Sequence, residues 1–207
     1  MNYKEYAILA AVTNSKEATP QDNLEHCWYG LVTEMGELVD ALKRKRFYKK
    51  EIDLVNLVEE IGDVCWYLTL GVTALEAMGI KMVDMDFYEQ EFNSGEFKDM
   101  LAVFKGADEK AADLVLAGVL SIGAAEAGDM LMPITKIDTE SAKVVNHLME
   151  VIHSLLCFAG FMGISMDQAR EANIKKLEAR YPDGFSTHRA LVRNLEVERA
   201  TLEESTT

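Results

Sequence analysis

Residues 31–68 read LVTEMGELVDALKRKRFYKKEIDLVNLVEEIGDVCWYL, and this stretch decides the fold. Glu34 and Glu37 are three residues apart, and Glu60 and Asp63 repeat that spacing. Residues three apart lie on one face of an α-helix, so each pair presents two carboxylates on the same side. Apolar residues at helical spacing surround both pairs. We expect two amphipathic helices, joined at the basic segment 43–50, whose acidic faces meet if the helices pack antiparallel.

Four carboxylates that converge between apolar helix faces repel one another strongly unless cations lie between them. Ligand sets made only of oxygen favour Mg²⁺ or Mn²⁺ over zinc. The sequence therefore predicts a Mg²⁺ site, in which Mn²⁺ can substitute, with Glu34, Glu37, Glu60 and Asp63 as ligands. The alternative is that these residues form ordinary salt bridges on a solvated surface, which their apolar neighbours disfavour.

The composition indicates a folded protein, because 49% of the 207 residues are hydrophobic and only three are proline. A net charge of −14 argues against binding to nucleic acid, since such proteins use clustered lysine and arginine to neutralise phosphates. Some of the negative charge belongs to the predicted metal site, and most of it is expected on a solvated outer face.

Three cysteines without CxxC spacing, in apolar helical segments, are typical of reduced, buried thiols: Cys27, Cys65 and Cys157. The first residues contain no apolar signal segment, and no uncharged run approaches the length of a membrane span. We therefore expect a cytoplasmic protein that does not insert into a membrane.

Helical periodicity recurs along the whole chain, and no segment shows convincing strand alternation, so the predicted fold class is all-α. The expected N-caps are Asp22, Asp53, Asp138 or Thr139, and Ser165. Gly79 is expected to end one helix and Pro133 another. The expected helices are residues 3–12, 22–46, 53–79, 82–92, 96–104, 108–131, 138–162, 165–180 and 186–203, with the last residues of the chain frayed.

The two halves of the chain resemble each other faintly, because the sequence Met-Gly-Ile at 78–80 recurs at 162–164. We expect a single all-α domain, residues 1–207, built as a helical bundle from two degenerate tandem repeats. The expected parts are a first repeat at 1–82, a connecting segment at 83–107, a second repeat at 108–190, and a polar C-terminal helix and tail at 191–207. Chance similarity between amphipathic helices is the alternative, and in either case the second half lacks a complete set of four acids.

The ordered set Glu34-x-x-Glu37, then Glu59-Glu60-x-x-Asp63, resembles the MazG-like all-α nucleoside triphosphate pyrophosphohydrolases. Residues 31–43 look like the first metal helix of that family, and residues 57–68 look like the second. Residues 173–182, followed by Phe185, are similar to its closing helix. The resemblance covers roughly the first 80 residues and residues 163–190.

This resemblance implies Mg²⁺-dependent hydrolysis of a (deoxy)nucleoside triphosphate to the monophosphate and pyrophosphate, for nucleotide pool sanitation or monophosphate supply. It also implies a homodimer or a higher homo-oligomer. Glu37 and Glu34 are the expected catalytic residues. Many family members carry a further glutamate where this chain has Thr33, so the general base is left open among Glu37, Glu59 and the metal alone.

Substrate contacts are expected from a second set of residues. On the closing helix, an amide and two cations (Asn173, Lys176 and Arg180) would face phosphate oxygens. Lys43 is a further candidate for binding phosphate. The alternative for these residues is a solvated helix.

A base pocket is expected at His26 and Trp28, although core packing is an equal alternative for Trp28. The base that the pocket would prefer is not predicted.

Three other functions compete with this interpretation. Glu150-x-x-His153 matches the motif of di-iron carboxylate bundles, which need two such motifs where this chain has one. The chain could instead be a non-catalytic helical protein that binds a nucleotide or a partner. A specialised relative would hydrolyse phosphoribosyl-ATP.

Overall fold

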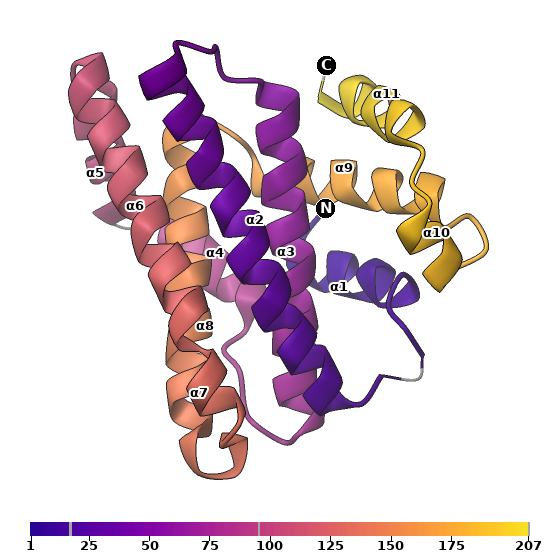
Figure 1. The fold of residues 1–207 in the computed structure, drawn as a ribbon. Helices are drawn as coiled ribbons and strands as arrows, with labels where there is room; N and C mark the ends of the chain where they lie inside the picture. The colour runs from indigo at the N-terminus through magenta and orange to yellow at the C-terminus, as the bar shows by residue number, and fades with distance from the viewer. Residues whose placement is uncertain (17, 95, 207) are drawn as a thin grey trace.

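The computed structural model describes residues 1–16, 18–94 and 96–206, and within these residues it contains helices and no strand (Figure 1). The predicted all-α fold class is therefore confirmed. The helices are α1 (Tyr3–Val12), α2 (Pro20–Tyr48), α3 (Leu54–Ala77), α4 (Met85–Ser94), α5 (Glu96–Lys105), α6 (Glu109–Asp129), α7 (Leu131–Ile134), α8 (Ile137–Met162), α9 (Met166–Arg180), α10 (Thr187–Leu191) and α11 (Leu195–Thr206).

Helices α2 and α3 lie side by side and antiparallel, joined by the short loop 49–53 (Figure 1). Thr19, not Asp22, is the N-cap of α2, and Pro20 occupies the first helical position, where no backbone donor is needed. Asp22 instead completes the capping box as the third helical residue. Asp53 caps α3 as expected, through a hydrogen bond from the backbone N–H of Asn56.

A second antiparallel pair, α6 and α8, packs beside the first and is linked by the short helix α7 (Figure 1). Pro133 lies inside α7 rather than closing the preceding helix, because the first turn of a helix needs no proline N–H. The N-cap of α8 is Lys136, without a side-chain hydrogen bond, so the caps expected at Asp138 or Thr139 were wrong. The tandem-repeat origin of the two pairs stays a prediction.

The buried apolar side chains form one contiguous cluster, to which each of the four long helices contributes. Examples are Leu31 of α2, Ile61 of α3, Leu120 of α6 and Leu148 of α8. Helix α3, which is apolar nearly all round, contacts α2, α8, α9 and α11 and is therefore central, as its sequence predicts. Helix α9 packs on α3, with Ser165 as its predicted N-cap. This contact brings α9 and the helices that follow it to the acidic stretch of α3.

The single polar helix expected at 186–203 is two helices, α10 and α11, separated by residues 192–194. Val192 leaves the helical conformation with φ −111° and ψ 83°. Helix α11 packs against α9, and Leu202 is fully buried in that contact. The C-terminal segment is thus an integral layer of the fold, and Arg193 belongs to the break before its last helix.

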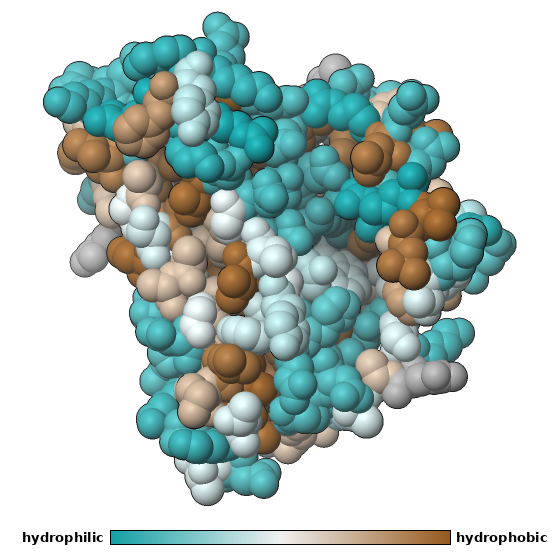
Figure 2. All heavy atoms as spheres, viewed as in Figure 1, coloured by the Kyte–Doolittle hydropathy of each residue, from teal (hydrophilic) through white to brown (hydrophobic). Residues whose placement is uncertain are grey.

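Two stretches, 109–134 and 137–162, are long and apolar enough to cross a membrane by length and composition alone. Core helices of soluble proteins meet the same criterion, and 61% of the apolar window in 137–162 is buried in the bundle. The window in 109–134 is only 28% buried. Its outer face carries exposed apolar side chains, among them Leu114 and Ile122. Figure 2 shows apolar areas on the side of the molecule where α6 lies in Figure 1.

Candidate metal centre

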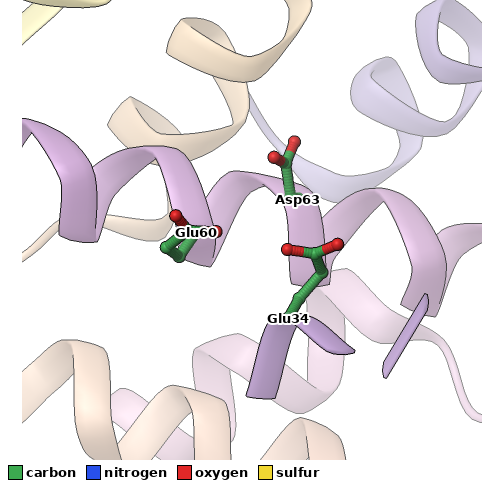
Figure 3. A group of neighbouring side chains, drawn as sticks. All are labelled: Glu34, Glu60 and Asp63. Carbon is green, nitrogen blue, oxygen red and sulfur yellow. The ribbon is translucent and has the colours of Figure 1, made fainter. Parts of the chain in front are cut away.

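Three carboxylates converge between α2 and α3. Glu34 comes from α2, and Glu60 and Asp63 come from α3 (Figure 3). One oxygen atom from each lies within 4.8 Å of the oxygens of the other two, and all three side chains are half-buried. The antiparallel packing therefore brings together three of the four predicted metal ligands.

Glu37 lies outside this group. Its side chain is exposed and lines a separate cavity of about 90 Å³ near the α2–α3 loop, together with Arg44, Lys50 and Asn56. In an antiparallel pair, a residue further along α2 faces an earlier residue of α3, so Glu37 lies toward the turn of α3 that carries Asn56. Asn56 in turn donates a hydrogen bond from Nδ2 to Glu60 Oε1, at 3.2 Å.

Asp63 has three short hydrogen bonds from α9. Lys176 Nζ lies 2.6 Å from both carboxylate oxygens, and Asn173 Nδ2 lies 2.7 Å from Oδ1. The hydroxyl of Tyr6 donates to Asn173 Oδ1 at 2.8 Å and so fixes the orientation of the amide. Lys176 and Asn173 are buried, which excludes the solvated-helix alternative for these two residues. In this structure they bind the acidic group itself.

The three carboxylates of Glu34, Glu60 and Asp63 repel one another, and Lys176 balances only part of their charge. Burial raises the pKa of Glu60 to about 8, and the nearby carboxylates of Asp63, Glu34 and Glu59 add to this shift. Burial also raises the pKa of Glu34, with a further contribution from Asp63. Lys176 offsets part of both shifts. Carboxylates that hold protons this strongly are the ones that a bound cation would stabilise in the ionised form.

A cavity of about 390 Å³ adjoins the carboxylates and includes Glu34 and Asp63 in its wall. Two guanidinium groups, of Arg180 and Arg193, also line it. The remaining polar and apolar lining comes from Thr13, His26, Trp66, Tyr67, Leu177, Tyr181, Phe185 and Ala190. The cavity thus combines an acidic edge, a cationic edge and an aromatic wall.

Helix α3 supplies two rings of the aromatic wall, those of Trp66 and Tyr67. The His26 ring packs edge-on against Trp66 and Tyr67, with centroids 5.7 Å and 5.3 Å away, and partial burial lowers the pKa of His26. Trp66 Nε1 donates to Thr13 Oγ1 at 2.9 Å, which fixes the indole. His26 therefore lies in the cavity wall, and its part in a base pocket stays a prediction.

Trp28 does not line this cavity. It packs against the core and against the ring of Tyr29, with centroids 4.4 Å apart, so core packing, the alternative interpretation, is what the structure shows. Trp66 was not identified from the sequence as a lining residue. Its spacing of three from Asp63, which places both on one helix face, was the available signal.

The two remaining candidate phosphate ligands differ in position. Arg180 lines the cavity and is bound to Glu198, with Nε–Oε1 at 2.9 Å and Nη2–Oε2 at 2.6 Å. Lys43 is half exposed, pairs with Asp40 three residues earlier on α2, and is not among the residues that line the cavity. Arg193, in the break before α11, was not identified from the sequence.

The motif Glu150-x-x-His153 lies on α8, apart from the three converging carboxylates. His153 Nδ1 is 3.1 Å from the hydroxyl of Tyr88. Within residues 1–16, 18–94 and 96–206, the three carboxylates of Glu34, Glu60 and Asp63 are the one group of three or more His, Cys, Asp or Glu side chains spaced to hold a metal ion. The second motif that a di-iron site requires is therefore not found in the described part of the chain.

Comparison with known proteins gives no further constraint. No family model matches the sequence, and no curated protein or solved structure shows significant similarity to the chain. We therefore infer function from the side-chain geometry, in which an oxygen-only ligand group borders a cavity with aromatic and guanidinium walls.

Proposed function

We propose that this chain is an Mg²⁺-dependent nucleoside triphosphate pyrophosphohydrolase, which converts a (deoxy)nucleoside triphosphate and water to the monophosphate and pyrophosphate. One observation carries the proposal: the carboxylates of Glu34, Glu60 and Asp63 converge at the edge of a cavity that also presents aromatic rings and two arginines. A nucleotide has a flat base, which can pack against the aromatic rings, and a polyanionic phosphate chain, which can bind the two arginines.

The three carboxylates fit a hard divalent cation. Mg²⁺ binds oxygen at about 2.1 Å, so two ligands on opposite sides of it lie about 4.2 Å apart. The oxygens here lie within 4.8 Å of one another, which is close to that distance. Glu34, Glu60 and Asp63 would hold the Mg²⁺, which would offset their charge, stabilise negative charge on the phosphates and lower the pKa of a bound water.

The size of the cavity suits the substrate. Its volume of about 390 Å³ lies within the range of roughly 300–1,000 Å³ that is usual for small-molecule sites. In the proposed complex, the base packs against the ring of Tyr67 or Trp66. The phosphates extend between the carboxylates and the arginines Arg180 and Arg193.

The reaction proposed is in-line attack of water on the α-phosphorus, with pyrophosphate as the leaving group. Lys176 and Asn173 hold Asp63 in one orientation, so the carboxylate of Asp63 needs little rearrangement during the reaction. The proton of the attacking water passes to a carboxylate. Glu34 is at the site, and Glu37 lies one helical turn further along α2.

A panel of common ribo- and deoxynucleoside triphosphates, each assayed with Mg²⁺ and with Mn²⁺, tests the proposal. We expect pyrophosphate as the first product and loss of turnover in Glu60→Gln. Glu150→Gln is the matched control, because Glu150 does not belong to the set of Glu34, Glu60 and Asp63. Orthophosphate as the first product would contradict attack at the α-phosphorus, and retained turnover in Glu60→Gln would exclude this site as the reaction centre.

A further inference from the structure

Glu198 of α11 is a charged residue that is almost completely buried. Only 3% of it is exposed, and its carboxylate is held by two guanidinium groups. Arg180 forms the two bonds described above, while Arg193 donates from Nη2 to Oε2 at 2.7 Å and from Nε to Oε2 at 3.2 Å. These contacts lower the pKa of Glu198 despite its burial. The carboxylate is therefore an ionised bridge between two cations.

Both of these arginines line the cavity that adjoins Glu34 and Asp63, whereas Glu198 does not line it. Arg180 is the last residue of α9, and Arg193 belongs to the break between α10 and α11. The side chains therefore start from different segments and meet only at Glu198. Arg193 also lies 3.9 Å from Glu59, which accepts a hydrogen bond from Lys176 at 3.3 Å, so the cluster is continuous with the polar network around Asp63.

Charge balance explains why an acidic residue is needed here. Two guanidinium groups repel each other at short range, and a loop residue such as Arg193 would turn toward solvent without an anchor. One carboxylate between two arginines leaves this group of three side chains with one net positive charge. Guanidinium groups held in place bind phosphate oxygens with less loss of conformational freedom than mobile ones.

We propose that Glu198 is a positioning residue, which holds Arg180 and Arg193 together at the cavity wall so that both bind the phosphate chain of the substrate. This inference rests on the proposed function and goes beyond it, because it makes the C-terminal helix part of the substrate site. Glu198 acts through the arginines and touches neither the substrate nor the metal ligands.

Steady-state kinetics of Glu198→Gln, with the best triphosphate substrate and saturating Mg²⁺, tests this role. The neutral amide removes the charge that pairs the arginines, so we expect KM to rise by about tenfold while kcat changes by less than about twofold. Glu198→Asp keeps the charge and should recover part of the loss in KM. Circular dichroism and thermal unfolding of each variant establish that it is folded under the assay conditions.

Arg199→Gln is the matched control. Arg199 ties the same helix to Asp53 at 2.9 Å and 3.2 Å, and neither residue lines the cavity. Its loss therefore weakens the docking of α11 but leaves both cavity arginines paired. We expect an unchanged KM in this variant. An equal rise in KM in both variants would overturn the proposal, because it would reduce Glu198 to a docking contact. An unchanged or lower KM in Glu198→Gln would also overturn it, while absence of turnover in the unmodified protein would overturn the proposed function itself.

Discussion

Lys176 on α9 and Asp63 on α3 form an ion pair in which Nζ lies 2.6 Å from each oxygen of the carboxylate. Lys176 is fully buried, and the second acid that it contacts is Glu59, at 3.3 Å. The pair joins the helix that carries two of the converging acids to the helix that closes the site. Lys176 is thus the cation in direct contact with the acidic residues Asp63 and Glu59.

Replacement of this lysine tests how strongly the pair holds the site. Lys176→Met removes the cation and leaves Asp63 among other carboxylates, and breaking one side of a buried pair costs about 3–5 kcal/mol. We expect a decrease of that order in the free energy of unfolding in chelator, measured by urea titration, and partial recovery with Mg²⁺. An unchanged urea midpoint would show that the pair carries little of the stability.

The raised pKa of Glu60 predicts an unusual pH dependence. A carboxyl group whose pKa is about 8 in the folded protein binds a proton more tightly there than in the unfolded chain. Its contribution to stability is fully present below its unfolded pKa of about 4.3 and is lost as the pH rises through about 8. We expect the metal-free protein to lose on the order of 2 kcal/mol between about pH 6 and pH 9, an effect moderated by solvent at this half-buried site.

Glu60→Gln provides the internal comparison for that measurement. The amide carries no charge at any pH, so the variant should be more stable than the unmodified protein at about pH 9 in chelator and should show a flatter pH dependence. Added Mg²⁺ should stabilise the unmodified protein at high pH far more than the variant. Equal pH slopes for the two proteins in chelator would mean that Glu60 is not the group that titrates.

The spacing between α3 and α9 depends on Gly62, which lies between Glu60 and Asp63, the two residues of α3 whose carboxylates converge with that of Glu34. A Cβ atom on Gly62 would lie 2.8 Å from Asn173 Cβ and 2.9 Å from the backbone oxygen of Ala169. We therefore expect Gly62→Ala to lower the free energy of unfolding by about 1–3 kcal/mol and to reduce turnover, because α9 must move away from Asp63. Gly36→Ala is the matched control.

At Gly36, an added Cβ would meet no atom within 4 Å, so the change should stabilise α2 by about 0.5–1 kcal/mol through helix propensity. Thermal unfolding and activity measured on both variants separate crowding at the α3–α9 contact from a general effect of replacing glycine. A destabilisation of equal size at both positions would contradict the close approach of the two helices.

The two tryptophans of the chain report separately on the cavity and the core. Trp66 lines the cavity, whereas Trp28 packs against the core, so nucleotide binding should change the fluorescence of Trp66 alone. We expect Trp28→Phe to retain the nucleotide-dependent change and Trp66→Phe to lose it, in a titration with nucleoside monophosphate. The reverse pattern would place the base near Trp28, as the sequence first suggested.

Much of the fold follows from local patterns in the sequence. The limits of α1 and the caps at Asp53 and Ser165 depend on residues close together in the chain, so they are predictable. Errors arose where two local signals compete, as at Thr19 and Asp22, which both belong to the capping box of α2. The break at residues 192–194 has no glycine or proline to indicate it.

The sequence by itself determined that two acidic helix faces exist, because side chains three residues apart share a face of any α-helix. Only the tertiary structure decided that Glu34 joins Glu60 and Asp63 while Glu37 does not, since this depends on where α2 and α3 lie against each other along their lengths. It likewise decided that Trp66 faces the cavity and that Arg193 meets Arg180 at Glu198. Contacts between distant segments are set by how whole helices pack, and no local spacing encodes them.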